Sequence, residues 1–323
     1  MRHFRTIILP LVLMLVGTVG GYILGKQGGS ATSVWHEERE QVSSYRYISP
    51  LLSCDGAELS NTTSGNLREL REQLQKFVDT QRRENSITRS AVYIRELHGG
   101  VWLGINERDE FTPGSLLKVP AVLSLYKYAE EKDPDVLTRE FEFDGSSVGV
   151  SQQYPPSEPL VPGSIYSIHD MVARALRFSD NDAAVLIAQT IEQSYLLDTY
   201  RDLGFVAPEM GNDYRIRVKD YASFFRILYN ASYINRAVSE EVLSLLAQSD
   251  FRRGLVAGLP TGTVIAHKFG ERDLGDGTHQ LHDCGIVYGE NPYIICVLSQ
   301  GTSFEALERF IASVAKITHG MLR

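Results

Sequence analysis

The chain has 323 residues, of which 43% are apolar and 22% charged, and its formal net charge at pH 7 is −8. This length and apolar content allow one large or two ordinary domains with a packed core, and they exclude a disordered or fibrous chain. An acidic chain lacks the basic face of a general nucleic-acid binder, so no nucleic-acid partner is expected. Three cysteines are too few for a disulfide-built scaffold, and no Cys-x-x-Cys pair indicates a zinc site.

The N-terminus contains an uncharged apolar segment. Arg2 and Arg5 precede residues 6–25, which as a helix would span about 30 Å, the thickness of a bilayer's hydrocarbon core. Residues 1–25 are therefore a membrane anchor or a cleaved signal segment, and the length of the run favours the anchor. Positive charge ahead of the helix favours a cytoplasmic N-terminus. We expect a single-pass cell-membrane protein with an extracytoplasmic body, or a secreted protein if the segment is cleaved.

A polar lead-in follows. Residues 26–64 are rich in Gly, Ser and Thr and weakly periodic, which predicts a stalk or linker before a folded domain at 65–323. In an oxidising exterior, Cys284 and Cys296 are candidates for a disulfide because they lie on expected neighbouring strands. Cys54 is a third candidate, and the sequence does not choose between the possible pairs.

The first half of the folded domain begins with a helix and a hairpin. Leucines at helical spacing over residues 66–83 predict an amphipathic helix. Residues 90–97 and 101–106 are β-rich and flank a His-Gly-Gly turn, which predicts a β-hairpin. The pattern between 107 and 262 is mostly helical, with one turn-rich interruption.

The second half returns to strands. Three strands are expected at 263–269, 282–288 and 293–299, followed by a helix from Ser303 that buries one apolar face. This order predicts an α/β (α+β) fold: a five-stranded antiparallel sheet with both terminal helices packed on it, plus an all-helical subdomain. A cleft between the sheet and the subdomain is the natural place for a site.

The first candidate catalytic motif is Ser115-x-x-Lys118. Pro113 and Gly114 end a loop, and an apolar helix is expected to begin at Ser115. Residues three apart share a helical face, so the Lys118 amine can reach the Ser115 hydroxyl. A serine becomes an effective nucleophile when a nearby base takes its proton, and a desolvated lysine can do so. The helix start also supplies backbone N–H groups to a developing oxyanion.

Ser-x-x-Lys alone is a weak pattern. It occurs again at Ser124 and Lys127 and at Ser313 and Lys316, both within expected helix interiors, where a structural role is the plain interpretation. The loop-to-helix context alone distinguishes Ser115 from these two serines.

Two further motifs add to the first. Ser179-Asp180-Asn181 lies between expected helices, where it is either an ordinary helix cap or a catalytic pair. In the second case Ser179 relays a proton to a leaving group and the Asn181 amide binds a substrate carbonyl. Lys268 and Gly270 lie at the end of the first late strand. There they form an ordinary edge, or else Lys268 attracts an anionic substrate and Gly270 lets the substrate backbone come close.

The order and contexts of these three motifs are together specific. Ser-x-x-Lys at a helix start, Ser-Asp-Asn between helices and Lys-x-Gly on a strand are the signature of one superfamily. From about residue 66 to the end, the chain resembles the class A β-lactamases and the serine D,D-peptidases (penicillin-binding proteins) that share their fold. It is identified as a divergent, membrane-anchored member.

The resemblance implies a role for each motif residue. Ser115 looks like the acylated nucleophile, and Lys118 like its general base or proton relay. Ser179 and Asn181 look like the proton-shuttling and substrate-binding pair, with Asp180 structural. Lys268 looks like the residue that helps bind a substrate carboxylate. The oxyanion hole would be formed by the backbone N–H groups of Ser115 and Glu271.

The function that follows from the resemblance is serine hydrolysis of an amide. Ser115 would form an acyl-enzyme with a β-lactam or with a D-Ala-D-Ala-like peptidoglycan stem peptide, and no cofactor is expected. The alternatives are a D,D-carboxypeptidase, or a slow-turnover penicillin-binding sensor or wall-binding module. A scaffold whose motifs are relics is disfavoured because the motif set is intact.

Two departures from the class A pattern stand out. The family's usual Lys-Thr-Gly has a threonine hydroxyl that bonds the substrate carboxylate, whereas Phe269 has none. The family's Glu-x-x-Leu-Asn, which supplies the base for deacylation, does not occur here. Glu209 is a weak substitute for that base, and Val185 replaces the asparagine that pins the family's loop. The acylation machinery is therefore complete and the deacylation machinery is not.

His279, His282 and Asp283 are close in sequence and are a conceivable set of metal ligands. Residues three apart on a strand point to opposite faces, so no metal site is expected there.

Overall fold

The computed structural model describes residues 45–49, 65–84, 87–147, 149, 151–208 and 214–322. The predicted anchor or signal segment and most of the predicted stalk lie outside these residues, as do Cys54 and Glu209. The domain boundaries and the membrane anchor therefore stay predictions. Within the described part of the chain, no helix is long and apolar enough to cross a bilayer.

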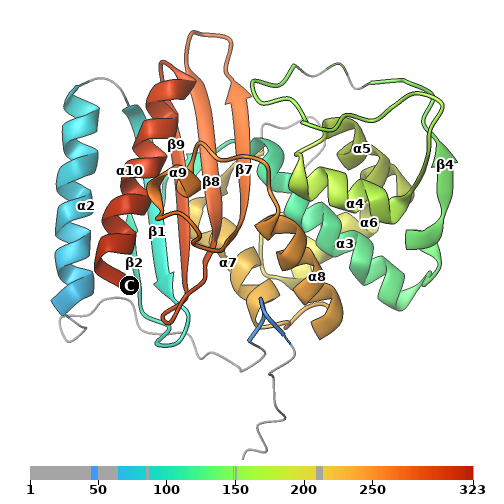
Figure 1. The fold of residues 1–323 in the computed structure, drawn as a ribbon, viewed down its shortest axis with the longest axis horizontal. Coiled ribbons are helices and arrows are strands. Elements are labelled where there is room, and N and C mark those ends of the chain that lie inside the picture. Colours follow the sequence, from blue (N-terminus) through green and yellow to red (C-terminus); the bar gives the residue numbers. More distant parts are fainter. Residues whose placement is uncertain are drawn as a thin grey trace, which may run out of the picture. The chain divides into compact units, whose positions relative to one another are not determined.

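A five-stranded antiparallel sheet forms the centre of the domain, in the order β2-β1-β9-β8-β7 (Figure 1). This confirms the predicted sheet. Its strands are β1 (Ile87–Glu96), β2 (Trp102–Ile105), β7 (Ile265–Asp273), β8 (His279–Val287) and β9 (Tyr293–Gly301).

The hairpin of β7 and β8 is longer than predicted. Strand β7 continues past Gly270 to Asp273, and β8 already begins at His279, because Glu271 pairs with Leu281 across the hairpin. Backbone pairing extends these strands through polar residues whose side chains lack the apolar alternation that predicts a strand. As a result, Glu271 lies on an edge strand and not in a loop.

Both terminal helices pack on one face of the sheet, as predicted. Helix α2 (Gly65–Arg83) buries its leucine stripe, and its Phe77 stacks on Phe310 of α10 (Phe304–Leu322), with ring centroids 5.5 Å apart. Figure 1 shows α2 and α10 side by side, with the short α9 (Leu255–Gly258) next to α10. Together they cover this face from solvent.

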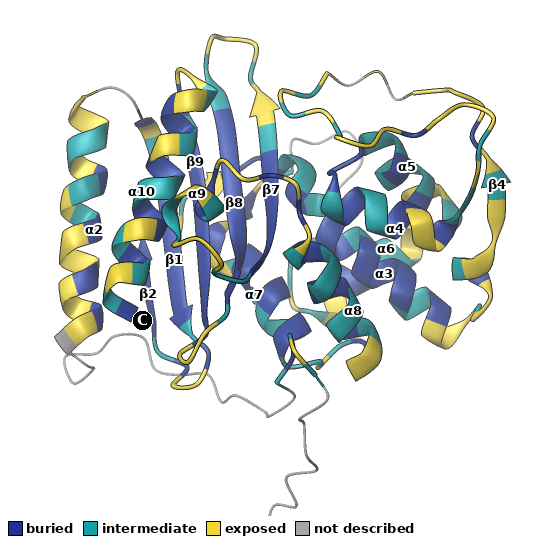
Figure 2. Ribbon diagram, in the orientation of Figure 1, coloured by how far each residue is buried: buried dark blue, intermediate teal, exposed yellow. Residues whose placement is uncertain are grey.

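The opposite face of the sheet packs on α7 (Val218–Tyr229). Alternate residues of β1 demonstrate the two-sided burial: Ala91 and Tyr93 join the core that contains α7, whereas Val92 and Ile94 join the core of α2 and α10. Figure 2 shows the central strands buried almost throughout. Burial on both faces explains why β9 reads as a nearly continuous apolar run.

The segment between β2 and β7 is mainly helical. It also contains two short antiparallel ladders that the sequence did not predict, since pairs of two or three residues are too short for a periodic signal. The ladders join β3 (Glu110–Phe111) to β6 (Ile216–Arg217) and β4 (Glu140–Glu142) to β5 (Ile165–Ser167). The remaining helices are α3 (Lys118–Glu131), α4 (Ile168–Arg177), α5 (Asn181–Thr190), α6 (Gln193–Asp202) and α8 (Arg236–Ala247).

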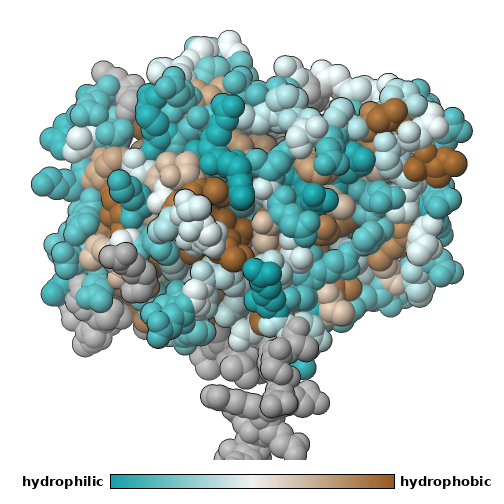
Figure 3. Space-filling view, in the orientation of Figure 1, coloured by the Kyte–Doolittle hydropathy of each residue, from teal (hydrophilic) through white to brown (hydrophobic). Residues whose placement is uncertain are grey.

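The surface seen in Figure 3 is mostly hydrophilic, with small separate apolar patches. Large apolar side chains that are exposed in the described part of the chain include Val161, Ile165 and Val206. Scattered exposed side chains of this kind are ordinary on a folded protein.

Candidate active site

Ser115 lies on a tight turn between strand β3 and helix α3. The turn is a 3₁₀ helix, η2 (Gly114–Leu117), and α3 begins directly after it, so the regular helix starts three residues later than predicted. Gly114 has a φ of +53°, and a Cβ there would lie 2.5 Å from the carbonyl oxygen of Glu271. Only glycine fits this position, which brings the backbone of β7 next to the serine.

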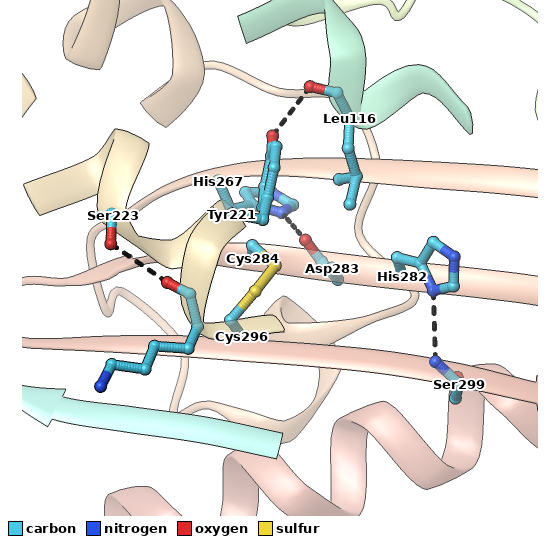
Figure 4. The surroundings of a disulfide bond; sticks show 10 residues. Leu116, Tyr221, Ser223, His267, His282, Asp283, Cys284, Cys296 and Ser299 are labelled. Carbon is cyan, nitrogen blue, oxygen red and sulfur yellow. Dashed lines mark hydrogen bonds and ion pairs between the residues drawn. A yellow bond between two sulfur atoms is a disulfide. The ribbon is translucent and has the colours of Figure 1, made fainter. Parts of the chain in front are cut away.

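Two buried side chains, one from helix α7 and one from strand β8, fix the backbone at this turn. The hydroxyl of Tyr221 on α7 donates to the carbonyl of Leu116 at 3.0 Å (Figure 4). Nε2 of His282 on β8 lies 3.0 Å from the Thr112 carbonyl, and its Nδ1 accepts from the Ser299 N–H. Burial lowers the pKa of His282 to about 4, so its ring is neutral and Nε2 is the donor. No local sequence pattern connects Tyr221 or His282 to the serine.

Lys118 is the centre of the site. Its Nζ lies 2.7 Å from Ser115 Oγ, 2.7 Å from Asn181 Oδ1 and 2.8 Å from the Ser179 carbonyl oxygen. The side chain is buried, and burial lowers the pKa of Lys118 to about 7, although the charges of Asp180 and Glu271 oppose this shift. A substantial fraction of the amine is therefore neutral near pH 7 and able to take the Ser115 proton.

The second Ser-x-x-Lys pair has no such arrangement. Ser124 donates to the Pro120 carbonyl within α3. Lys127 forms an i,i+4 ion pair with Glu131 at 3.0 Å. These contacts agree with the structural interpretation of that pair.

Ser179 lies directly beside the two lysines. It has a φ of +57°, unusual for a residue other than glycine, and it is fully buried. Its Oγ lies 2.8 Å from Lys268 Nζ and 3.3 Å from Lys118 Nζ. Asp180 caps α5 by accepting from the N–H groups of Asp182 and Ala183. This cap holds the Ser179 conformation at the helix start.

Lys268 is fully buried behind Ser179. Besides the Ser179 hydroxyl, it donates to the carbonyl of Phe269 at 2.9 Å. Burial, with the nearby charge of Lys118 as a smaller cause, lowers the pKa of Lys268 well below its usual value. Its predicted contact with a substrate carboxylate stays a prediction, because the structure places its amine on protein oxygens.

Gly270 packs against the nucleophile turn. A Cβ on Gly270 would lie 2.5 Å from the Pro113 carbonyl oxygen and 3.0 Å from the Leu116 nitrogen. The missing side chain therefore lets β7 approach the turn, whereas the sequence suggested approach by a substrate. A contact of Gly270 with substrate stays a prediction.

Glu271 contributes more than a backbone group. Its carboxylate accepts from the N–H groups of Gln153 at 3.0 Å and Tyr154 at 3.1 Å. Burial raises the pKa of Glu271, while these two hydrogen bonds oppose the shift. The sequence predicted a role only for the Glu271 N–H, because nothing local in the sequence connects this side chain to residues more than a hundred positions earlier.

Phe269 packs in the core, and the Lys268 amine lies 4.3 Å from the centre of its ring. Only 2% of its surface is exposed, and its ring stacks on Phe251 with centroids 4.1 Å apart. The edge of the Tyr154 ring contacts the same ring at 5.7 Å. An aromatic residue at this position of the Lys-x-Gly motif is therefore explained by packing.

These groups surround a cavity of about 840 Å³ between the sheet edge and the helical subdomain. The position of the predicted cleft is thus confirmed. Ser115, Lys118 and Asn181 reach the cavity, and Ser179 and Lys268 lie buried behind them. The other described lining residues are Gly114, Leu117, Ala121, Ser151, Gln152, Gln153, Ala184, Val185, Ala188, Leu196, Tyr200, Pro208, Glu271, Arg272, Asp273 and Phe304.

Cys284 and Cys296 form a disulfide between β8 and β9 (Figure 4). The two residues are directly opposite in the strand register, which settles the open choice for this pair. Next to the disulfide, His267 and Asp283 form a buried pair with Nδ1 and Oδ1 2.8 Å apart. The second carboxylate oxygen of Asp283 accepts from the Leu255 N–H.

His279 and His282 lie in different surroundings. The His279 ring stacks on Phe304 with centroids 4.5 Å apart, whereas His282 supports the Thr112 carbonyl. They are thus engaged in separate contacts.

The fold is that of the β-lactamases and transpeptidases. The model of the β-lactamase enzyme family matches residues 69–322, and the chain belongs to this family. A search of curated protein sequences found no match.

Solved structures agree at the level of the fold. PBP-A matches with a TM-score of 0.66 and 18% identity over 83% of this chain and 98% of that chain. A β-lactamase from Xanthomonas campestris pv. campestris matches with a TM-score of 0.67 and 17% identity over 79% and 99%. A class A β-lactamase from Mycobacterium abscessus matches with a TM-score of 0.65 and 17% identity over 78% and 98%.

Proposed function

We propose that this protein is an extracytoplasmic serine hydrolase that forms an acyl-enzyme on Ser115 with a β-lactam or a D-Ala-D-Ala-like stem peptide. One observation carries the proposal: the Lys118 amine lies 2.7 Å from Ser115 Oγ, and burial lowers its pKa to about 7. A serine with a neutral amine at this distance is an activated nucleophile.

Acylation would proceed in two proton-coupled steps. Neutral Lys118 takes the Ser115 proton while Oγ forms a bond to the amide carbonyl carbon, and the N–H groups of Ser115 and Glu271 stabilise the oxyanion. When the C–N bond breaks, the Ser179 hydroxyl gives its proton to the leaving nitrogen. The proton on Lys118 then returns to Ser179 Oγ, 3.3 Å away, which restores the neutral amine.

Substrate recognition would use the remaining motif residues. Asn181 supplies an amide at the cavity wall, and its Oδ1 also accepts from Lys118. With Lys118 neutral, a protonated Lys268 would be the group that favours a substrate with a carboxylate, which both β-lactams and stem peptides carry. Gly270 keeps the edge of β7 close to the serine.

A penicillin-binding sensor or D,D-carboxypeptidase with slow hydrolysis of β-lactams is the second candidate. The α5 side of the cavity presents Ala184, Val185 and Ala188, none of which can activate a deacylating water. Glu209, the weak candidate for a base, lies outside the described residues. A mutant of PBP-A is known as an acyl-enzyme complex with penicillin G, which supports acylation as a step that this fold performs.

The proposed location outside the cytoplasm rests on two features. The uncharged segment 6–25 is suited to export or anchoring, and the Cys284–Cys296 disulfide is typical of an oxidising compartment. The test is the accessibility of an epitope at the C-terminus of the full-length chain in intact cells. Labelling only after permeabilisation would overturn this part of the proposal.

The activity test combines a fluorescent penicillin and a chromogenic cephalosporin with the full chain, and follows intact mass and product together. A lasting mass increase on Ser115 with little product supports the sensor or peptidase, whereas rapid product without an adduct supports a β-lactamase. Ser115→Ala should abolish the adduct, and Ser124→Ala is the matched control. An adduct that persists in Ser115→Ala would overturn acylation by Ser115, and no reaction in the wild type would overturn β-lactams as its substrates.

A further inference from the structure

Residues 151–154, here called the strap, cross from the helical subdomain to the edge of the sheet. Ser151, Gln152 and Gln153 line the same cavity as Ser115. We propose that the strap is the specificity-determining wall of this cavity, and that the Glu271 carboxylate and the packing of Tyr154 latch it in place. The inference rests on the proposed acylation of Ser115 and adds which substrate side groups are accepted.

The first contact of the latch is electrostatic. One carboxylate, that of Glu271, accepts two consecutive backbone N–H groups of the strap, from Gln153 and Tyr154. Hydrogen bonds to an ionised acceptor are about twice as strong as neutral ones. Since Glu271 is on β7 beside Gly114, the strap is tied directly to the strand that borders the nucleophile.

The second contact reaches the catalytic groups. The side-chain amide of Gln152 donates to the Ser179 carbonyl at 3.1 Å. Lys118 donates to this same carbonyl at 2.8 Å. A displacement of the strap would therefore change the hydrogen bonding of the oxygen that holds the general base.

The third contact is an aromatic socket for Tyr154. Its ring meets Phe251, Phe269 and Phe304 edge-on, with centroid distances of 5.0, 5.7 and 5.9 Å. Its hydroxyl donates to Glu308 of α10 at 2.7 Å. Phe269, the departure from the Lys-Thr-Gly pattern, is thus one wall of the socket that holds the strap.

These contacts determine what the cavity admits. An acyl group on Ser115 would extend past Asn181, and the strap and α5 border the same space. Two backbone hydrogen bonds and the packing of the Tyr154 ring hold the latched strap. A large side group could displace the strap only by breaking these contacts. We therefore expect selection against substrates with bulky side groups next to the reacting carbonyl.

The experiment uses full-length wild type, Glu271→Gln and Glu308→Gln, with Glu290→Gln in an exposed turn as the matched control. The first readout is hydrogen exchange of the strap peptide, which needs no substrate. The second is the rate constant of acylation by 6-aminopenicillanic acid, which has no acyl side group, and by a penicillin with a bulky aromatic one. Thermal unfolding establishes that each variant is folded.

The expected result is an increase of about tenfold in strap exchange for Glu271→Gln, because at least one charge-assisted bond is lost. In Glu271→Gln, the ratio of the acylation rate constant for the bulky penicillin to that for 6-aminopenicillanic acid should also rise by about tenfold. In Glu308→Gln the same ratio should rise less. The Glu290→Gln control should match the wild type in both readouts.

Three outcomes separate this inference from the proposed function. Unchanged strap exchange in both latch variants overturns the latch. Faster exchange with an unchanged rate ratio overturns the role in specificity. If exchange becomes faster but neither penicillin acylates the wild type, the latch is supported and the proposed β-lactam reaction is overturned.

Discussion

Lys118 and Lys268 converge on one hydroxyl group, that of Ser179, with N–O distances of 3.3 and 2.8 Å. Both amines are buried, and burial lowers the pKa of each. Two neighbouring buried ammonium groups are strongly unfavourable, so a proton is easily passed through the hydroxyl between them. This arrangement suits a site that takes a proton from Ser115 and delivers one to a leaving group.

The pH dependence of acylation follows from Lys118. Below its pKa of about 7 the amine is protonated and cannot take the Ser115 proton, so the acylation rate should rise with pH through about 7 and level off above. Stopped-flow measurements with a fluorescent penicillin over about two pH units on either side of that pKa would establish the curve. A rate that falls as the pH rises through 7 contradicts the role of Lys118 as base.

Removing the Lys118 amine should slow acylation far more than removing the amine of Lys127, which is further along the same helix. We expect Lys118→Met to lower the acylation rate by roughly 10²–10⁴-fold, the usual contribution of a general base. Lys127→Met loses an ion pair with Glu131 and a cation–π contact with Tyr233, both away from Ser115, and should stay near the wild-type rate. Equal effects of the two substitutions on labelling would show that the Ser115 context is unimportant.

Tyr221 should act as a positioning residue. Tyr221→Phe keeps the ring and removes the bond to the Leu116 carbonyl, which leaves a buried acceptor without this donor. A loss of about 1–3 kcal/mol in unfolding free energy is expected, together with a lower maximal acylation rate and an unchanged apparent affinity for the β-lactam. A change in affinity alone would argue that Tyr221 contacts the substrate and not the turn.

His282 should make the fold sensitive to acid. Its pKa is lowered from 6.5 to about 4, so as the pH falls below 6.5 the unfolded chain binds a proton that the folded protein does not. The contribution of neutral His282 to the unfolding free energy is fully present above pH 6.5. It is lost as the pH falls towards 4, and it amounts to roughly 3 kcal/mol. Urea unfolding of wild type and His282→Gln at both ends of this window measures the difference. The variant should lose less stability on acidification, and equal losses would rule out His282 as the source.

Much of the fold could be predicted because apolar spacing is local. The leucine stripe of α2 and the apolar runs of β8 and β9 identified a helix and two strands, and their order implied the antiparallel sheet. The extension of β7 to Asp273 and the short ladders could not be predicted, since backbone pairing alone makes them. The same limit applied to the start of α3, because 3₁₀ and α-helical turns share one pattern.

By itself, the sequence determined the types of reactive group and their order along the chain. Ser115, Lys118, Ser179, Asn181 and Lys268 were found because their motifs are short and their spacing is local. Tertiary structure alone decided what surrounds these groups. His282 and Tyr221 lie under the turn, the Glu271 carboxylate binds the strap, and Phe269 packs in the core. The physical reason is that hydrogen bonds, burial and pKa shifts depend on neighbours in space, which come from strands and helices far apart in sequence.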